Sequence, residues 1–163
     1  GEAYGFDGLN NNLHHFSRIE QLSGIHVKKV YGHSNHLAIL TNKGQIMTYG
    51  KGTHGQCGNG TLEGNATFRL IKSNENVEFI DVALGENHSI FITKDGNAFS
   101  CGNNEHCQLC LGMTNKPVLD PTRSDLVVGK AVGAICGSNH TLILINSKRI
   151  HHPGMKSFGI KQI

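Results

Sequence analysis

The fold is decided by the stretch GENHSIFITKDG, residues 85–96, in which an apolar run lies between two turns. A related stretch, HSNHLAILTNKG, occupies residues 33–44, and a third, GSNHTLILINSK, occupies residues 137–148. The three stretches follow one another at a spacing of 52 residues, with no insertion or deletion between them. Self-similarity at a fixed period of this length is typical of repeat architectures.

The repeat brings one histidine per unit to the same position. Because His36, His88 and His140 recur in phase, we interpret them as structural residues. An imidazole at the start of a central strand can bond backbone groups that the preceding turn leaves unpaired. The other structural positions of the repeat are glycines: Gly44 and Gly96 share one position, and Gly50, Gly102 and Gly154 share another.

The apolar runs indicate strands that are covered on both faces. Gly44 and Gly96 follow the first two runs, where a tight hairpin needs a positive φ and the chain turns back into an antiparallel strand. The sequence therefore predicts an all-β fold, a partial β-propeller of about three four-stranded antiparallel blades with a 52-residue repeat. The apolar runs are 37–40, 90–92 and 142–145, and the other expected strands are 27–31, 45–49, 67–71, 79–83, 97–101 and 117–119.

We expect a single propeller segment over residues 1–163. The repeat divides it into blades at about 6–50, 51–102 and 103–154, with 155–163 as the start of the next connection. The connections 51–67 and 103–120 are long, and loops on a rigid scaffold are the usual place for function.

The amino-acid composition bears on the cellular compartment of the protein and on its partners. The 163 residues include 21 glycines and no tryptophan, and no apolar run approaches the roughly 20 residues that cross a bilayer. No secretory signal pattern is present at the N-terminus, and five cysteines do not make a disulfide framework. We therefore expect an intracellular protein, nuclear or cytoplasmic, without a membrane partner. The net charge of +3 favours a nucleic-acid partner only weakly.

A cluster of sulfur and imidazole groups suggests a zinc or redox site. Cys101, His106, Cys107 and Cys110 lie within ten residues, and the last two cysteines have the spacing of half a zinc site. No second pair follows, and Cys107 and Cys110 fall on the repeat positions of two glycines. We favour a structural interpretation of the cluster and expect no metal and no cofactor.

The C-terminal end carries the best candidate for partner binding. No acidic residue follows Asp125, and Lys148, Arg149, His151 and His152 form a basic group suited to phosphate or to an acidic protein surface. A solvated blade edge is the alternative. We find no nucleophile elbow, phosphate-cradling loop or paired carboxylates, so we name no catalytic residue.

The repeat resembles blades of the regulator of chromosome condensation family, whose pattern is G-x-x-H-T-x-x-L-T-x-x-G-x-V-(Y/F)-x-W-G-x-N-x-x-G-Q-L-G. Residues 85–104 match it best, while Tyr49, Cys101 and Pro153 replace its tryptophan. The resemblance implies a non-catalytic propeller that binds proteins. The alternative that it implies is a guanine-nucleotide exchange factor for a Ran-type small GTPase, associated with chromatin.

The resemblance also bears on assembly, because family propellers have about seven blades. Three blades leave apolar sheet faces uncovered at both ends. We therefore expect either self-association or a complementary fragment that completes the ring.

Overall fold

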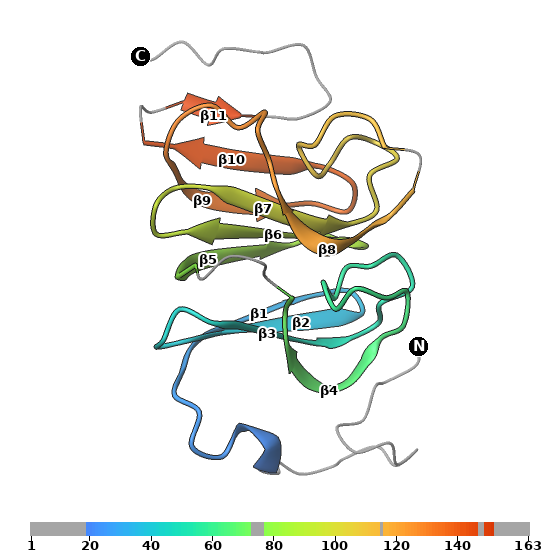
Figure 1. Cartoon of the computed structure of the whole chain (residues 1–163), viewed down its shortest axis with the longest axis vertical. Coiled ribbons are helices and arrows are strands. Elements are labelled where there is room, and N and C mark those ends of the chain that lie inside the picture. The colour runs from blue at the N-terminus through green and yellow to red at the C-terminus, as the bar shows by residue number, and fades with distance from the viewer. Residues whose placement is uncertain (1–18, 73–76, 115, 147–148, 152–163) are drawn as a thin grey trace.

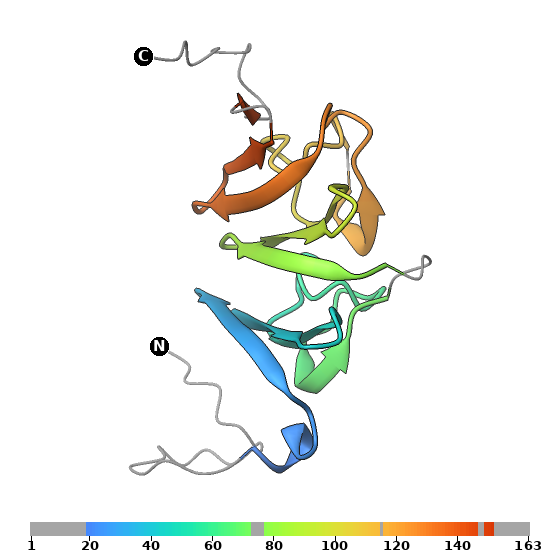
Figure 2. The same cartoon turned by 90° about the vertical axis from the view of Figure 1, so that its left-hand side faces the viewer.

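The computed structural model describes residues 19–72, 77–114, 116–146 and 149–151, the last three by their backbone alone. Apart from a short 3-10 helix at Glu20–Leu22, the elements in this part of the chain are β-strands. They form three antiparallel sheets that follow one another along the long axis of the molecule (Figures 1 and 2). The predicted all-β propeller architecture is confirmed.

Each sheet is built from strands that are consecutive in the sequence, in the orders β1-β2-β3-β4, β5-β6-β7-β8 and β11-β10-β9. Their first strands begin at Val27, Phe79 and Ala131, so the period of 52 residues is preserved in space. The third sheet has three strands within the described residues. The strands are β1 Val27–His33, β2 His36–Thr41, β3 Ile46–Gly50, β4 Asn65–Leu70, β5 Phe79–Leu84, β6 His88–Thr93, β7 Ala98–Gly102, β8 Val118–Arg123, β9 Ala131–Cys136, β10 Thr141–Ile145 and β11 Arg149–His151.

The sheets begin later than the repeat units marked in the sequence. They span residues 27–70, 79–123 and 131–151, because the strand at 65–70 pairs with β3 of the preceding unit through Met47 and Leu70. A sequence period fixes the length of a unit, but it does not fix the residue at which its sheet starts.

The predicted hairpins are present between β2 and β3 and between β6 and β7. Gly44 has a φ of +70° and Gly96 a φ of +87°, which L-amino acids with a side chain rarely adopt. A Cβ on Gly44 would also lie 2.3 Å from Cγ of Glu78 at the start of the second sheet. These glycines therefore serve both the turn and the close approach of the next sheet.

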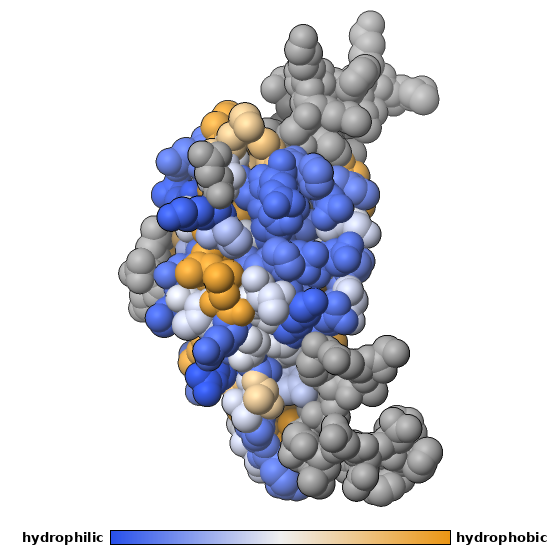
Figure 3. Space-filling view, turned by 90° about the vertical axis from the view of Figure 1, so that its right-hand side faces the viewer, coloured by the Kyte–Doolittle hydropathy of each residue, from blue (hydrophilic) through white to orange (hydrophobic). Residues whose placement is uncertain are grey.

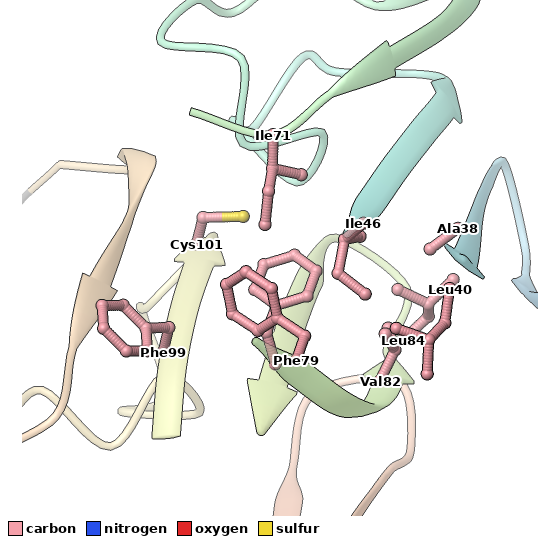
Figure 4. Packing of buried hydrophobic residues seen from close by; sticks show 10 residues of the cluster. Ala38, Leu40, Ile46, Ile71, Phe79, Val82, Leu84, Phe99 and Cys101 are labelled. Atoms are coloured by element: carbon pink, nitrogen blue, oxygen red, sulfur yellow. The ribbon is translucent and has the colours of Figure 1, made fainter. Parts of the chain in front are cut away.

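The hydrophobic core lies between the sheets. Ala38 and Leu40 of the first sheet pack against Phe79 and Val82 of the second (Figure 4). Phe91 of the second sheet belongs to the same cluster. A second cluster joins the second and third sheets through residues that include Ile90, Ile92 and Ile143. All six residues of β6 are buried, as expected for a strand whose side chains alternate between two covered faces.

No helix among the described residues is long and apolar enough to cross a membrane.

Candidate interaction surface

A buried bridge of three groups connects the first sheet to the second. Nε2 of His36 lies 3.0 Å from Oγ of Ser89, and that hydroxyl donates a hydrogen bond of 2.8 Å to the carbonyl of Gln56. Since the hydroxyl proton goes to the carbonyl, Nε2 carries a proton and donates to the hydroxyl oxygen. We call this arrangement the histidine bridge.

The histidine bridge recurs one unit later. Nε2 of His88 lies 3.0 Å from Oγ1 of Thr141, which donates a 2.7 Å hydrogen bond to the carbonyl of Gln108. These contacts differ from the bonds to backbone groups of the preceding turn that the sequence suggested. The imidazole bonds a hydroxyl of the next sheet and not a backbone group of its own turn, so it connects two blades.

Burial lowers the pKa of both bridge histidines to about 4, with a smaller contribution from neighbouring histidines. His36 is 2% exposed and His88 is 0% exposed. Nδ1 of each ring is buried without a hydrogen-bond partner, which is consistent with a bare nitrogen and a neutral ring.

We predict that Thr141→Val lowers the free energy of unfolding by about 2–3 kcal/mol, because it leaves the His88 imidazole and the Gln108 carbonyl buried and unpaired. Thr122→Val is the matched control. The Thr122 hydroxyl is exposed and donates to the carbonyl of Asp120, so its loss should cost under about 0.5 kcal/mol. Chemical denaturation of both variants measures the difference, and equal effects would exclude a bridge of this strength.

The same glutamines fix the long loops after β3 and β7. Gln56 and Gln108 are fully buried, and each side-chain oxygen accepts a hydrogen bond from the backbone N–H two residues earlier. At the base of the loops, Thr48 and Ser100 donate to backbone carbonyls nine residues later. The loop bases are therefore held rigidly against the sheets.

One side of the molecule carries the long loops after β3 and β7, together with the β1–β2 turn and the β5–β6 turn (right-hand side of Figure 1). We call this side the loop rim. Figure 3 shows this side as mostly hydrophilic, with a small group of hydrophobic residues on it. Leu62, in the loop after β3, is 50% exposed, and Met113, in the loop after β7, is 88% exposed. Loops that are fixed at their bases and expose apolar side chains are suited to binding another protein.

The cysteine cluster has a structural explanation. Cys107 and Cys110 both have a φ of +58°, and Gly55 and Gly58 at the equivalent positions have φ values of +81° and +60°. All five cysteines are free thiols, and burial raises the pKa of Cys110 to about 12. Within the described residues, no group of three potential metal ligands comes together.

We predict that Cys107→Gly raises the free energy of unfolding by about 0.5–1 kcal/mol. Relief of the left-handed backbone should exceed the entropic cost of glycine in the unfolded chain. Cys136→Gly, in β9, should instead lower the free energy of unfolding, because glycine weakens a strand. Thermal unfolding compares the two, and a loss of stability in both variants would contradict this interpretation of Cys107.

The structure describes only part of the predicted basic site. Arg149 and His151 lie in β11, where their backbone alone is described, and Lys148 and His152 lie outside the described residues. Gly154 also lies outside them. Their joint role in partner binding therefore stays a proposal.

The hydroxyl and carbonyl groups of the histidine bridge were missed in the sequence. Ser89 and Thr141 each follow a repeat histidine directly, and Gln56 and Gln108 are 52 residues apart. A hydroxyl residue therefore follows the histidine in the second and third units. The first unit has Leu37 at this position, so the pattern is not shared by all three units.

Comparison with protein families identifies the repeat. A model described as the regulator of chromosome condensation (RCC1) repeat matches residues 43–92 and 95–144, and a second model of that description matches residues 79–108. The chain belongs to the RCC1 repeat family. The expected family is thus confirmed, and most of the chain lies within the matched RCC1 repeats.

Curated relatives cover much of the chain. It is 33% identical over 132 residues to the human E3 ubiquitin-protein ligase HERC2, a match to 80% of the chain and 3% of HERC2. It is 26% identical over 156 residues to human RCC2, a match to 94% of the chain and 30% of RCC2. The chain thus spans less than a third of the length of either RCC1-repeat relative.

Solved structures agree with the fold. Human WBSCR16 is similar at a TM-score of 0.72 and 26% identity, over 77% of this chain and 32% of that one. Prp20p of Saccharomyces cerevisiae is similar at a TM-score of 0.73 and 22% identity, over 84% of this chain and 39% of that one. These RCC1-like neighbours support the assignment of the three sheets as propeller blades.

Proposed function

We propose that this RCC1-repeat chain is a non-catalytic propeller segment that binds a protein partner through the loop rim. The observation that carries the proposal is the exposure of Leu62 and Met113 on loops whose bases are fixed by fully buried glutamines. Apolar side chains held in place in this way contribute to binding at a low cost in conformational entropy.

The reactive side chains support the same proposal. The buried histidines bond hydroxyls between sheets, and two of the cysteines take glycine-like turn positions. We interpret these groups as architectural, which supports a non-catalytic role. The free thiols fit the proposed intracellular setting, nuclear or cytoplasmic.

The proposal is tested with a photo-crosslinking residue at position 113. The same residue at position 70, which is exposed but lies outside the loop rim, is the control. Leu70 is 53% exposed on β4 and is a control for Leu62, which is 50% exposed. We expect a partner to be crosslinked from position 113 alone. Leu62→Glu or Met113→Glu should weaken the affinity of the purified partner by at least about tenfold, and Leu70→Glu by less than about twofold. Equal effects at all three positions would exclude the loop rim.

The second candidate is nucleotide exchange on a Ran-type small GTPase with chromatin binding. It is favoured by family membership and by the similarity to yeast Prp20p, whose structure was described with its binding properties to Gsp1p and histones. Exchange needs only a surface that stabilises the nucleotide-free GTPase. Accelerated release of labelled GDP from a purified Ran-type GTPase would support this candidate, and an unchanged release rate with the rest of a propeller present would reject it.

We propose the basic group as a second contact with an acidic partner surface or with phosphate. Replacing Lys148 and Arg149 by alanine should weaken such binding and reduce its dependence on salt. His151→Ala and His152→Ala should have smaller effects near pH 7, where most imidazoles are neutral. Titration of the variants at two salt concentrations tests this contact, and an unchanged salt dependence would reject it.

A further inference from the structure

The glycine-like turn positions of Cys107 and Cys110 account for their backbone but not for their thiols. The equivalent residues of the first unit are Gly55 and Gly58, which adopt a positive φ without a side chain to strain. A left-handed residue that carries a side chain is strained relative to glycine. The second unit has this strain at both positions of the turn, and strain of this kind is common at functional sites.

The two cysteines close one β-turn. The backbone N–H of Cys110 donates a hydrogen bond of 3.2 Å to the carbonyl of Cys107, three residues earlier. The Cα atoms of two residues that close a β-turn lie less than about 7 Å apart. Disulfides join residues whose Cα atoms lie about 4.4–6.8 Å apart, so the turn brings the two cysteines within reach of an S–S bond.

The repeat indicates that both side chains leave the turn on the same side. A Cβ built on Gly55 would lie 2.8 Å from a backbone oxygen of β8, and a Cβ built on Gly58 would lie 3.1 Å from a side-chain carbon of β8. Both positions of the first turn therefore face the same strand of the following sheet. Because Cys107 and Cys110 share these positions and the positive φ, we infer that their Cβ atoms also point to one side.

The two residues between the cysteines hold the turn in place. The carbonyl of Gln108 accepts a hydrogen bond of 2.7 Å from Thr141, and the carbonyl of Leu109 accepts one of 2.8 Å from Ser100. The N–H of Leu109 donates a hydrogen bond of 3.0 Å to Oδ1 of Asn104. Because the backbone of the turn is already fixed, an S–S bond across it orders little additional chain.

The two thiols differ in their surroundings. Cys107 is half-buried, whereas Cys110 is 1% exposed, and burial raises the pKa of Cys110 to about 12. The thiolate and not the thiol is the nucleophile, and oxidants reach exposed sulfur first. Cys107 is therefore the thiol that an oxidant in solution attacks, and Cys110 is the partner that waits beside it.

We propose that Cys107 and Cys110 are a reversible disulfide pair that hydrogen peroxide oxidises. The sulfur of Cys107 attacks the O–O bond, which breaks to give a sulfenic acid and one water. The sulfur of Cys110 then attacks the sulfenic sulfur, an S–S bond forms, and the sulfenic hydroxyl leaves with the thiol proton as a second water. Two molecules of a small thiol such as glutathione reverse the reaction, since they return two hydrogens to the cysteines and become a disulfide themselves.

Differential alkylation tests the pair. The reduced chain is treated with hydrogen peroxide, the remaining thiols are blocked with a light reagent in denaturant, and disulfides are then reduced and labelled with a heavy reagent. We expect heavy label on Cys107 and Cys110 and light label on Cys57 and Cys101, which are 0% exposed. The intact mass before alkylation should be that of a single chain that has lost two hydrogen atoms. Fragment ions in tandem mass spectrometry assign each label to its cysteine.

Two variants remove the second thiol. In Cys110→Ser the heavy label at Cys107 should fall at least about tenfold, and dimedone should trap a sulfenic acid there. Cys110→Gly places the residue of the first unit in the turn and should behave in the same way without strain. Met113 is 88% exposed in the same loop, so its sulfoxide reports that the peroxide has reached the loop.

Light label on both cysteines in a chain whose Met113 is oxidised would overturn the inference. Heavy label on Cys110 together with Cys136 would overturn it as well, because the Cys136 side chain packs against the hydrophobic cluster that contains Cys110. So would a sulfinic acid on Cys107 of the unaltered chain in place of the disulfide. These readouts need no binding partner, so the proposed role of the loop rim is tested separately.

Discussion

Gly102→Ala should lower the free energy of unfolding by about 3–5 kcal/mol, the largest effect that we expect from one methyl group. Gly102 has a φ of +111° and ends β7. A Cβ there would lie 2.4 Å from the carbonyl oxygen of Asn87 and 2.6 Å from Cα of His88. Both contacts are with backbone, so no side-chain rotation relieves them, and movement of the backbone would displace the histidine of the bridge.

Gly24→Ala separates the backbone contribution from the steric one. Gly24 also has a positive φ, of +77°, but a Cβ there would meet nothing within 4 Å. Its replacement should cost only about 1–2 kcal/mol, the energy of a left-handed residue with a side chain. Chemical denaturation gives both values, and equal losses in the two variants would show that contact with the histidine turn is not what makes Gly102 necessary.

The second large effect is a loss of stability in mild acid. Burial lowers the pKa of His36 and His88 from 6.5 to about 4. Between these values the unfolded chain binds protons that the folded chain does not. The free energy of unfolding should therefore fall as the pH drops from 6.5 to 4, by about 3 kcal/mol for each histidine. Electrostatic interactions with His36, His33 and His140 add to the lowering of the pKa of His88.

Denaturation curves across this pH range measure the effect. The double variant His36→Gln and His88→Gln should show a much flatter dependence between pH 6.5 and 4, whatever its stability at neutral pH. His106→Gln replaces an exposed histidine and should leave the dependence unchanged. An unaltered slope in the double variant would mean that other groups are responsible for the acid sensitivity.

Local patterns in the sequence were sufficient to predict the strands and their turns. The apolar run at Ile90–Ile92 and the glycine at position 96 identify a covered strand and its hairpin without any distant contact. The pairing of Asn65–Leu70 with the preceding sheet was not predictable in the same way. A period is equally consistent with either neighbour, and the choice depends on the path of the long loop after β3.

Less of the interaction surface than of the fold could be predicted from the sequence. The bridge from His36 to Ser89 spans 53 residues and depends on how one sheet stacks on the next. Exposure of Met113 likewise depends on a loop whose base is fixed by the buried Gln108, and loop composition does not reveal it. The role of Cys107 and Cys110 was easier to predict, because both lie at repeat positions where another unit has a glycine in a turn.

The most direct measurement of the stacked-blade architecture is the nitrogen NMR spectrum of the His36 and His88 rings at neutral pH. We predict a protonated Nε2 and a bare Nδ1 in both rings, together with a nuclear Overhauser contact between the His88 ring and Thr141 in the next sheet. A protonated Nδ1 in both rings, or rings that lack any contact with the following sheet, would contradict the bridges and the blade-to-blade stacking that they hold.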